Sequence, residues 1–236
     1  MPYYGINGLY WDPMHLVLIG ALLLSIIAQS LVSSTYRRYS AVKTMRGITS
    51  ADAARTILSS RALYDVRVET GLRALSDHYD PKNKVIRLGG NEQTMSSVAA
   101  VAVAAHECGH AIQHAEGYGP LKFRTALVPV VNFTSRLALP LMLVGWILGY
   151  AVIAEIGMVI FGAVLLFQLV TLPVEFNASK RALNLLEQGH LESGEVPIAK
   201  KVLNAAAQTY VATLIISALY FLKFFLYIFI RLKHDD

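Results

Sequence analysis

Long apolar tracts divide this chain into predicted membrane-crossing and polar parts. The tracts cover residues 14–32, 126–172 and 210–230, and the middle one is long enough for two crossings joined near Gly149. A helix of about 20 apolar residues crosses the ~30 Å hydrocarbon core of a bilayer. The pattern therefore predicts four transmembrane helices.

The polar stretch after the first tract contains the signals of shorter elements. Capping residues, alternation of apolar with charged residues, and glycine stops predict a helix over 49–63, strands around 66–68 and over 84–88, and a helix over 94–114. The second helix is rich in alanine, and its uninterrupted apolar part is too short to cross a bilayer. We expect it to be buried within the protein.

That second helix carries the sequence His-Glu-Cys-Gly-His at residues 106–110. Side chains four residues apart lie on one helix face, about 6 Å apart along the axis, so two imidazoles can hold one zinc ion. A glutamate directly after the first histidine can take a proton from zinc-bound water. We predict His106 and His110 as zinc ligands and Glu107 as the general base, with purely structural histidines as the ordinary alternative.

A catalytic zinc site needs a third protein ligand. His114 lies about 12 Å from His106 along the same helix, too far to share one ion, and the chain lacks the Asp-Gly pair of site-2-type intramembrane proteases. The remaining candidate for the third ligand is a carboxylate on another helix. Glu175 is the best placed, because an ionised side chain at the mouth of a span is costly without a partner. An interfacial or capping role for it stays open, as do the loop acids Glu187, Glu192 and Glu195.

Composition agrees with a membrane protein. Hydrophobic residues make up 55% of the 236 residues and the mean hydropathy is +0.47, whereas soluble domains are about 45–50% apolar. The net charge is +5, but its distribution matters more than its size. Positive residues near a bilayer report orientation, so we do not expect nucleic-acid binding. The single cysteine, Cys108, permits no internal disulfide, and we expect it to be a small packing residue.

Positive residues collect on one side of the predicted spans. Four Lys and Arg residues lie between positions 37 and 46, and none lies between 137 and 172. Since Lys and Arg are enriched in cytoplasmic loops, we expect both polar stretches to face the cytoplasm and the N-terminus to lie outside. Arg231 and Lys233 disagree with an outer C-terminus, so the orientation of the last span stays open.

Three blocks of the sequence resemble the bacterial YugP-type membrane zinc metallopeptidases. They are Ser-Asp-His-Tyr-Asp-Pro at 76–81, the motif block at 104–115, and Leu-Pro-Val-Glu-Phe-Asn-Ala-Ser at 172–179. The family is grouped loosely with the HtpX-like gluzincins, whose third ligand is the Glu of an E-x-x-x-D motif. The resemblance places that Glu at Glu175 and its Asp at Ser179, which implies a weaker supporting contact or one supplied from elsewhere.

The expected fold is a mainly α membrane protein with about four transmembrane helices and a cytoplasmic zincin-like α+β catalytic layer that carries a short β element. The expected segments are an outer segment and first span (1–34), a catalytic region with the motif helix (35–125), a transmembrane hairpin (126–172), a cytoplasmic region with the third ligand (173–206), and the last span and tail (207–236).

The expected function is that of a zinc-dependent endopeptidase in the bacterial cytoplasmic membrane, with its active site facing the cytoplasm. Its expected partners are protein or peptide substrates, membrane proteins among them, and the lipid bilayer; a homo-oligomer or an accessory membrane protein stays open. We expect the run 84–88 to act as an edge strand that pairs with an extended substrate. The alternatives are a non-enzymatic membrane scaffold or transport component with a structural zinc site, and a metallohydrolase of a non-peptide substrate.

Overall fold

Four long apolar helices dominate the computed structural model, which describes residues 4–6, 9–11, 14–70, 77–89 and 96–235. These helices are α1 (Met14–Ser40), α4 (Gly119–Leu148), α5 (Ala151–Leu185) and α6 (Val196–Asp235). Each contains a stretch long and apolar enough to cross a membrane. The four predicted spans are therefore confirmed as candidate spans, although the helices continue well beyond the apolar tracts.

One compact unit is built from the apolar parts of the chain, Met1–Ala28, Arg124–Val170 and Tyr210–Asp236. The turn between α4 and α5 lies where it was expected, with Gly149 at φ 74°. A Cβ atom added at Gly157 would come within 2.6 Å of the backbone nitrogen of Met142. The two helices of this hairpin therefore approach each other at backbone distance. The unit also contains a short hairpin of β1 (Tyr4–Ile6) and β2 (Leu9–Trp11), which the sequence pattern did not predict.

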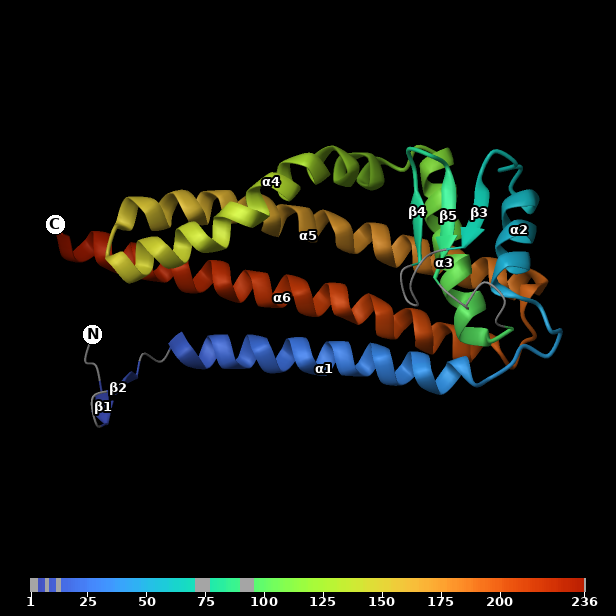
Figure 1. The fold of residues 1–236 in the computed structure, drawn as a ribbon, viewed down its shortest axis with the longest axis horizontal. Coiled ribbons are helices and arrows are strands. Elements are labelled where there is room, and N and C mark those ends of the chain that lie inside the picture. Colours follow the sequence, from blue (N-terminus) through green and yellow to red (C-terminus); the bar gives the residue numbers. More distant parts are fainter. Residues whose placement is uncertain (1–3, 7–8, 12–13, 71–76, 90–95, 236) are drawn as a thin grey trace. The chain divides into compact units, whose positions relative to one another are not determined.

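The second compact unit comprises Gln29–Phe123 and Thr171–Thr209. It contains α2 (Ser50–Ser60), a three-stranded sheet, α3 (Val98–Ala115), a short π-helical turn η2 (Leu186–His190) and the adjoining parts of the long helices. Figure 1 shows the three strands side by side. Apolar side chains of α2, the sheet, α3, α5 and α6 form one core, which includes Ile57, Ile86, Leu88, Val101, Leu186 and Leu203.

The sheet corrects the expected role of residues 84–88. Its strand order is β3 (Arg67–Thr70), β5 (Val85–Leu88), β4 (His78–Asp80). β5 is parallel to β3 and antiparallel to β4, so both of its sides are hydrogen-bonded. The prediction that this run is an edge strand available to substrate is therefore wrong. β4 was not predicted as a strand, because its sequence does not alternate between apolar and polar residues. Its pairing with β5 makes β5 the central strand.

Helices α2 and α3 begin at capping side chains. Thr49 accepts a hydrogen bond from the backbone of Asp52, and Ser97 accepts one from Ala100, which satisfies backbone N–H groups that have no partner within the helix. α2 ends at Ser60, earlier than predicted. α3 begins at Val98, later than predicted; the first residues of the expected helix, Thr94 and Met95, lie outside the described residues. Most of α3 is buried, as its alanine-rich sequence indicated.

Gly109 brings α3 against α5. A Cβ atom at this position would lie 2.6 Å from the carbonyl oxygen of Ala178, closer than real Cβ contacts allow. Gly109→Ala should therefore push the two helices apart and destabilise the fold by about 1–3 kcal/mol. Thermal unfolding of the purified protein measures this, and zinc affinity should fall with it. Gly20→Ala in α1, where nothing lies within 4 Å, is the control and should leave both unchanged.

Candidate metal centre

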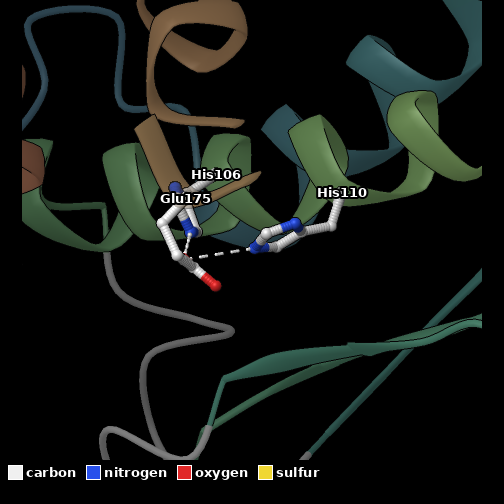
Figure 2. Close-up of side chains that lie close together, drawn as sticks. All are labelled: His106, His110 and Glu175. Carbon is white, nitrogen blue, oxygen red and sulfur yellow. Dashed lines mark hydrogen bonds and ion pairs between the residues drawn. The ribbon is translucent and has the colours of Figure 1, made fainter. Parts of the chain in front are cut away.

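Three side chains from two helices meet at one point. α3 supplies His106 and His110, and α5 supplies Glu175 (Figure 2). The Glu175 Oε2 atom lies 3.2 Å from His106 Nε2 and 3.5 Å from His110 Nε2. The three ligand atoms all lie within 4.8 Å of one another. The structure thus brings together the three residues predicted as ligands, across 69 residues of sequence.

The spacing of these atoms fits a zinc ion. Zinc binds His nitrogen and carboxylate oxygen at about 2.0–2.2 Å, which in a tetrahedron separates neighbouring ligand atoms by roughly 3.3 Å. The distances of 3.2 and 3.5 Å match that edge. Two nitrogens and one oxygen are also the donor types of the His₂Glu catalytic zinc sites, which leave a fourth position for water. The donor set and the two distances to Glu175 therefore fit zinc.

Burial differs among the three side chains. Glu175 is 2% exposed, whereas the side chains of His106 and His110 are 15% and 11% exposed. A carboxylate removed from water is costly unless it is paired, and here both imidazoles face it. The histidines keep limited access to solvent, as a site that admits a water molecule requires.

Gln113 fixes the orientation of His110. The Gln113 Nε2 atom donates to the carbonyl oxygen of Val174 at 2.8 Å and to Asn177 Oδ1 at 3.0 Å. Its Oε1 atom, 3.0 Å from His110 Nδ1, must therefore accept, so Nδ1 carries the ring proton. The lone pair of His110 is left on Nε2, the nitrogen that faces Glu175. This is the tautomer that a metal ligand needs.

Ser179 supports the other histidine. Its hydroxyl lies 3.1 Å from His106 Nδ1, which leaves Nε2 to face Glu175. The serine therefore occupies the place that the resemblance gave to an aspartate, and it makes the supporting contact with a neutral group. The contact is weaker than the one an aspartate would make, because a neutral hydroxyl forms a weaker hydrogen bond with the imidazole than a charged carboxylate does.

The charges of two neighbouring acids affect the pKa of His110. Burial disfavours its charged form, but the hydrogen bond to Glu175 and the charges of Glu107 and Glu175 outweigh burial and raise the pKa of His110. Glu107, the predicted base, is 7% exposed and follows His106 directly on α3. Glu175 and Glu107 thus place negative charge near His110, which favours a cation at this point.

The other candidates lie elsewhere. Glu192 pairs with Arg46 at 2.6 Å, and Glu195 accepts from the backbone N–H of Met45 at 2.7 Å, so neither belongs to the cluster. Glu187 is exposed. The Nδ1 atom of His114 lies 2.8 Å from the hydroxyl of Tyr79. These loop acids and the third histidine of the helix are therefore outside the candidate site.

Cys108 is a packing residue, as predicted. Its side chain is fully buried, and its sulfur lies 3.7 Å from the carbonyl oxygen of Ala54 in α2. Burial, and secondarily the charge of Glu107, raise the pKa of the thiol. The thiol therefore stays protonated and points toward α2, away from the two histidines.

The role of Gln113 was not predicted from the sequence. Gln113 lies three residues after His110, so helical spacing places it on the histidine face of α3. This spacing could have indicated that Gln113 supports His110. Gln113→Leu should leave His110 Nδ1 and the backbone at Val174 without their partner and lower zinc affinity about 10–100-fold. Competition with a fluorescent chelator measures this. Gln188→Leu, at an exposed position beyond α5, is the matched control; an equal effect there would contradict the assigned role.

Comparison with known proteins identifies the family. Residues 14–229 match a family model described as "Putative neutral zinc metallopeptidase". The chain belongs to this family. It is also 45% identical over 207 residues to "Putative membrane protease YugP" of Bacillus subtilis (strain 168), in an alignment that covers 87% of this chain and 92% of the relative. No solved structure matches the chain.

Membership of the zinc metallopeptidase family confirms the resemblance given by the three sequence blocks. The match covers the stretch from the start of α1 into α6, so it includes all three side chains of the cluster and all four candidate spans. The chain is therefore a membrane member of a zinc metallopeptidase family.

Proposed function

We propose that this protein is a zinc-dependent endopeptidase of the cytoplasmic membrane, with His106, His110 and Glu175 as zinc ligands and Glu107 as the general base. The observation that carries the proposal is the convergence of the three ligand atoms within 4.8 Å. The family description supports peptide hydrolysis. A zinc ion at this point would supply Lewis-acid activation of water and polarise the scissile carbonyl.

The protein's own residues divide the remaining tasks. Glu107 takes the proton of the attacking water and returns it to the leaving amine. Gln113 and Ser179 hold the two imidazoles in position through their Nδ1 atoms. Glu175 neutralises charge at the site while its own side chain stays buried. Glu107 is adjacent to His106 on α3, and its charge acts on His110, which supports its role as the base.

A scaffold or transport component with a structural zinc site is less well supported. Structural zinc sites are closed by four protein ligands, whereas the cluster found among the described residues has three. The proposal is tested by metal content together with cleavage of an unfolded protein, for the wild type and for Glu107→Gln. Zinc-bound wild-type protein that cleaves no polypeptide would favour the alternative, or a hydrolase of another substrate.

The substrates we propose are proteins or peptides, including membrane proteins, that reach the site from the cytoplasm. The orientation is supported by the positive residues in and after the last turns of α1 and by Lys180 and Arg181 near the end of α5, with none between 137 and 172. β4 is now the candidate strand for substrate pairing on the side nearer the motif helix, since β5 is central and β4 packs with α3.

Cysteine labelling tests the orientation. Tyr64 is 78% exposed, and the native Cys108 is fully buried, so Tyr64→Cys introduces one reactive thiol on an unreactive background. A membrane-impermeant maleimide should label this variant in inverted vesicles and not in intact cells. The wild type should be labelled only after denaturation. Labelling of Tyr64→Cys in intact cells would place the site on the outer side.

A further inference from the structure

A cavity of about 490 Å³ lies apart from the metal centre, within the second compact unit. It is formed by the last turns of α1 and the first turns of α6, which run antiparallel (Figure 1). Residues at helical spacing on each helix line it, among them Leu31, Ser34 and Arg38 of α1, and Lys201, Asn204 and Gln208 of α6.

Both helices change from apolar to polar at this cavity. The apolar tract of α1 ends at residue 32, and that of α6 begins at residue 210. Leu31 and Gln208 therefore lie at the apolar ends of the lining, and Arg38 and Lys201 lie about two turns farther into the polar parts. Two spans that end at the same cavity place it at the level of the lipid headgroups.

The lining carries positive charge without compensating acids. Arg38 and Lys201 are its two ionisable cations, and no Asp or Glu is among its lining residues. Within the described part of the chain neither forms an ion pair; the Arg38 guanidinium lies over the ring of Tyr39, 5.5 Å from its centroid. Hydroxyl and amide side chains about one turn nearer the apolar tracts offer hydrogen bonds. This chemistry suits a phosphate group that is attached to apolar chains.

We propose that this cavity binds the headgroup of an anionic phospholipid from the surrounding bilayer. Arg38 and Lys201 pair with the phosphate, and Asn204 donates to its oxygens. The Ser34 hydroxyl, which donates to the Leu31 carbonyl oxygen, accepts from a headgroup hydroxyl, and Leu31 contacts the start of an acyl chain. The lipid then bridges α1 and α6 where both leave the membrane. This inference is independent of the peptidase activity.

Binding is tested with the full-length protein in detergent after removal of native lipid. Phosphatidylglycerol, phosphatidylcholine and inorganic phosphate are added separately, and bound lipid is counted by native mass spectrometry alongside the thermal unfolding temperature. Phosphatidylglycerol should bind the wild type and raise its unfolding temperature. Arg38→Gln combined with Lys201→Gln should weaken that binding roughly thirtyfold, as expected for the loss of two cations that pair directly with the phosphate.

The matched control replaces the neighbouring cations, Arg37→Gln with Lys200→Gln, which are exposed like Arg38 and Lys201 but lie outside the lining. It should bind phosphatidylglycerol like the wild type. An equal loss in both double variants would overturn the site in favour of general surface attraction. An equal response to phosphatidylcholine, or to inorganic phosphate alone, would also overturn it. If the cavity variant does not fold, Arg38→Lys with Lys201→Arg must retain binding, and its loss would refute the proposal.

Discussion

Replacing Glu107 with glutamine should abolish peptide hydrolysis while zinc remains bound. Glutamine keeps the size of the buried side chain and removes the carboxylate that accepts a proton. General-base catalysis contributes about 10²–10⁴-fold to a rate, so the turnover rate of an unfolded protein substrate should fall by at least that range. Cleavage of a fluorescent casein and zinc content by mass spectrometry are measured on the same preparation.

Glu187→Gln is the matched control for this experiment. Glu187 is an exposed acid in the turn after α5, and its replacement should change neither activity nor zinc content. If Glu107→Gln lost its zinc instead, Glu107 would be part of the metal-binding set rather than the base. If it kept both zinc and activity, another group would be moving the proton.

Replacing Glu175 with alanine should remove the metal. Glu175 is the oxygen donor between the two imidazoles and the point where α5 contributes to the cluster. Outer contacts to a zinc ligand are worth about 10–100-fold in affinity, so loss of a ligand itself should weaken zinc binding by more than about 100-fold. Activity should fall in parallel at limiting zinc. Chelator competition measures the affinity.

Glu187→Ala again provides the comparison, since it removes an acid that is absent from the cluster. Full zinc occupancy in Glu175→Ala at equal chelator would refute Glu175 as a ligand. High zinc concentration should restore part of the activity of Glu175→Ala but none of the activity of Glu107→Gln. This difference separates the metal-binding role from the proton-transfer role.

The features that the sequence predicted well are local ones. The spans follow from uninterrupted apolar runs, and the cap at Thr49 follows from a single side chain near a helix start. His106 and His110 follow from helical spacing alone. Span ends were less predictable, because a helix satisfies its own backbone hydrogen bonds and continues into polar sequence, as α5 does from residue 172 to Leu185.

The features that the sequence did not predict depend on partners far away in the chain. β5 became central because β4, a strand of three residues, pairs with it. Gln113 became a support for His110 because its amide reaches Val174 and Asn177 on α5. Glu175 was singled out by its place after a span and by resemblance. Its contact with both imidazoles depends on the close approach of the backbones at Gly109 and Ala178.

The distance along the chain between His106 and Glu175 has a consequence for biosynthesis. The two residues are 69 positions apart, and α4 and the first part of α5 are made between them. At about 5–20 residues per second, a ribosome needs roughly 3–14 s to pass from one to the other. During that interval the nascent chain carries the histidines without their carboxylate. Completion of the ligand set therefore waits for synthesis of the hairpin.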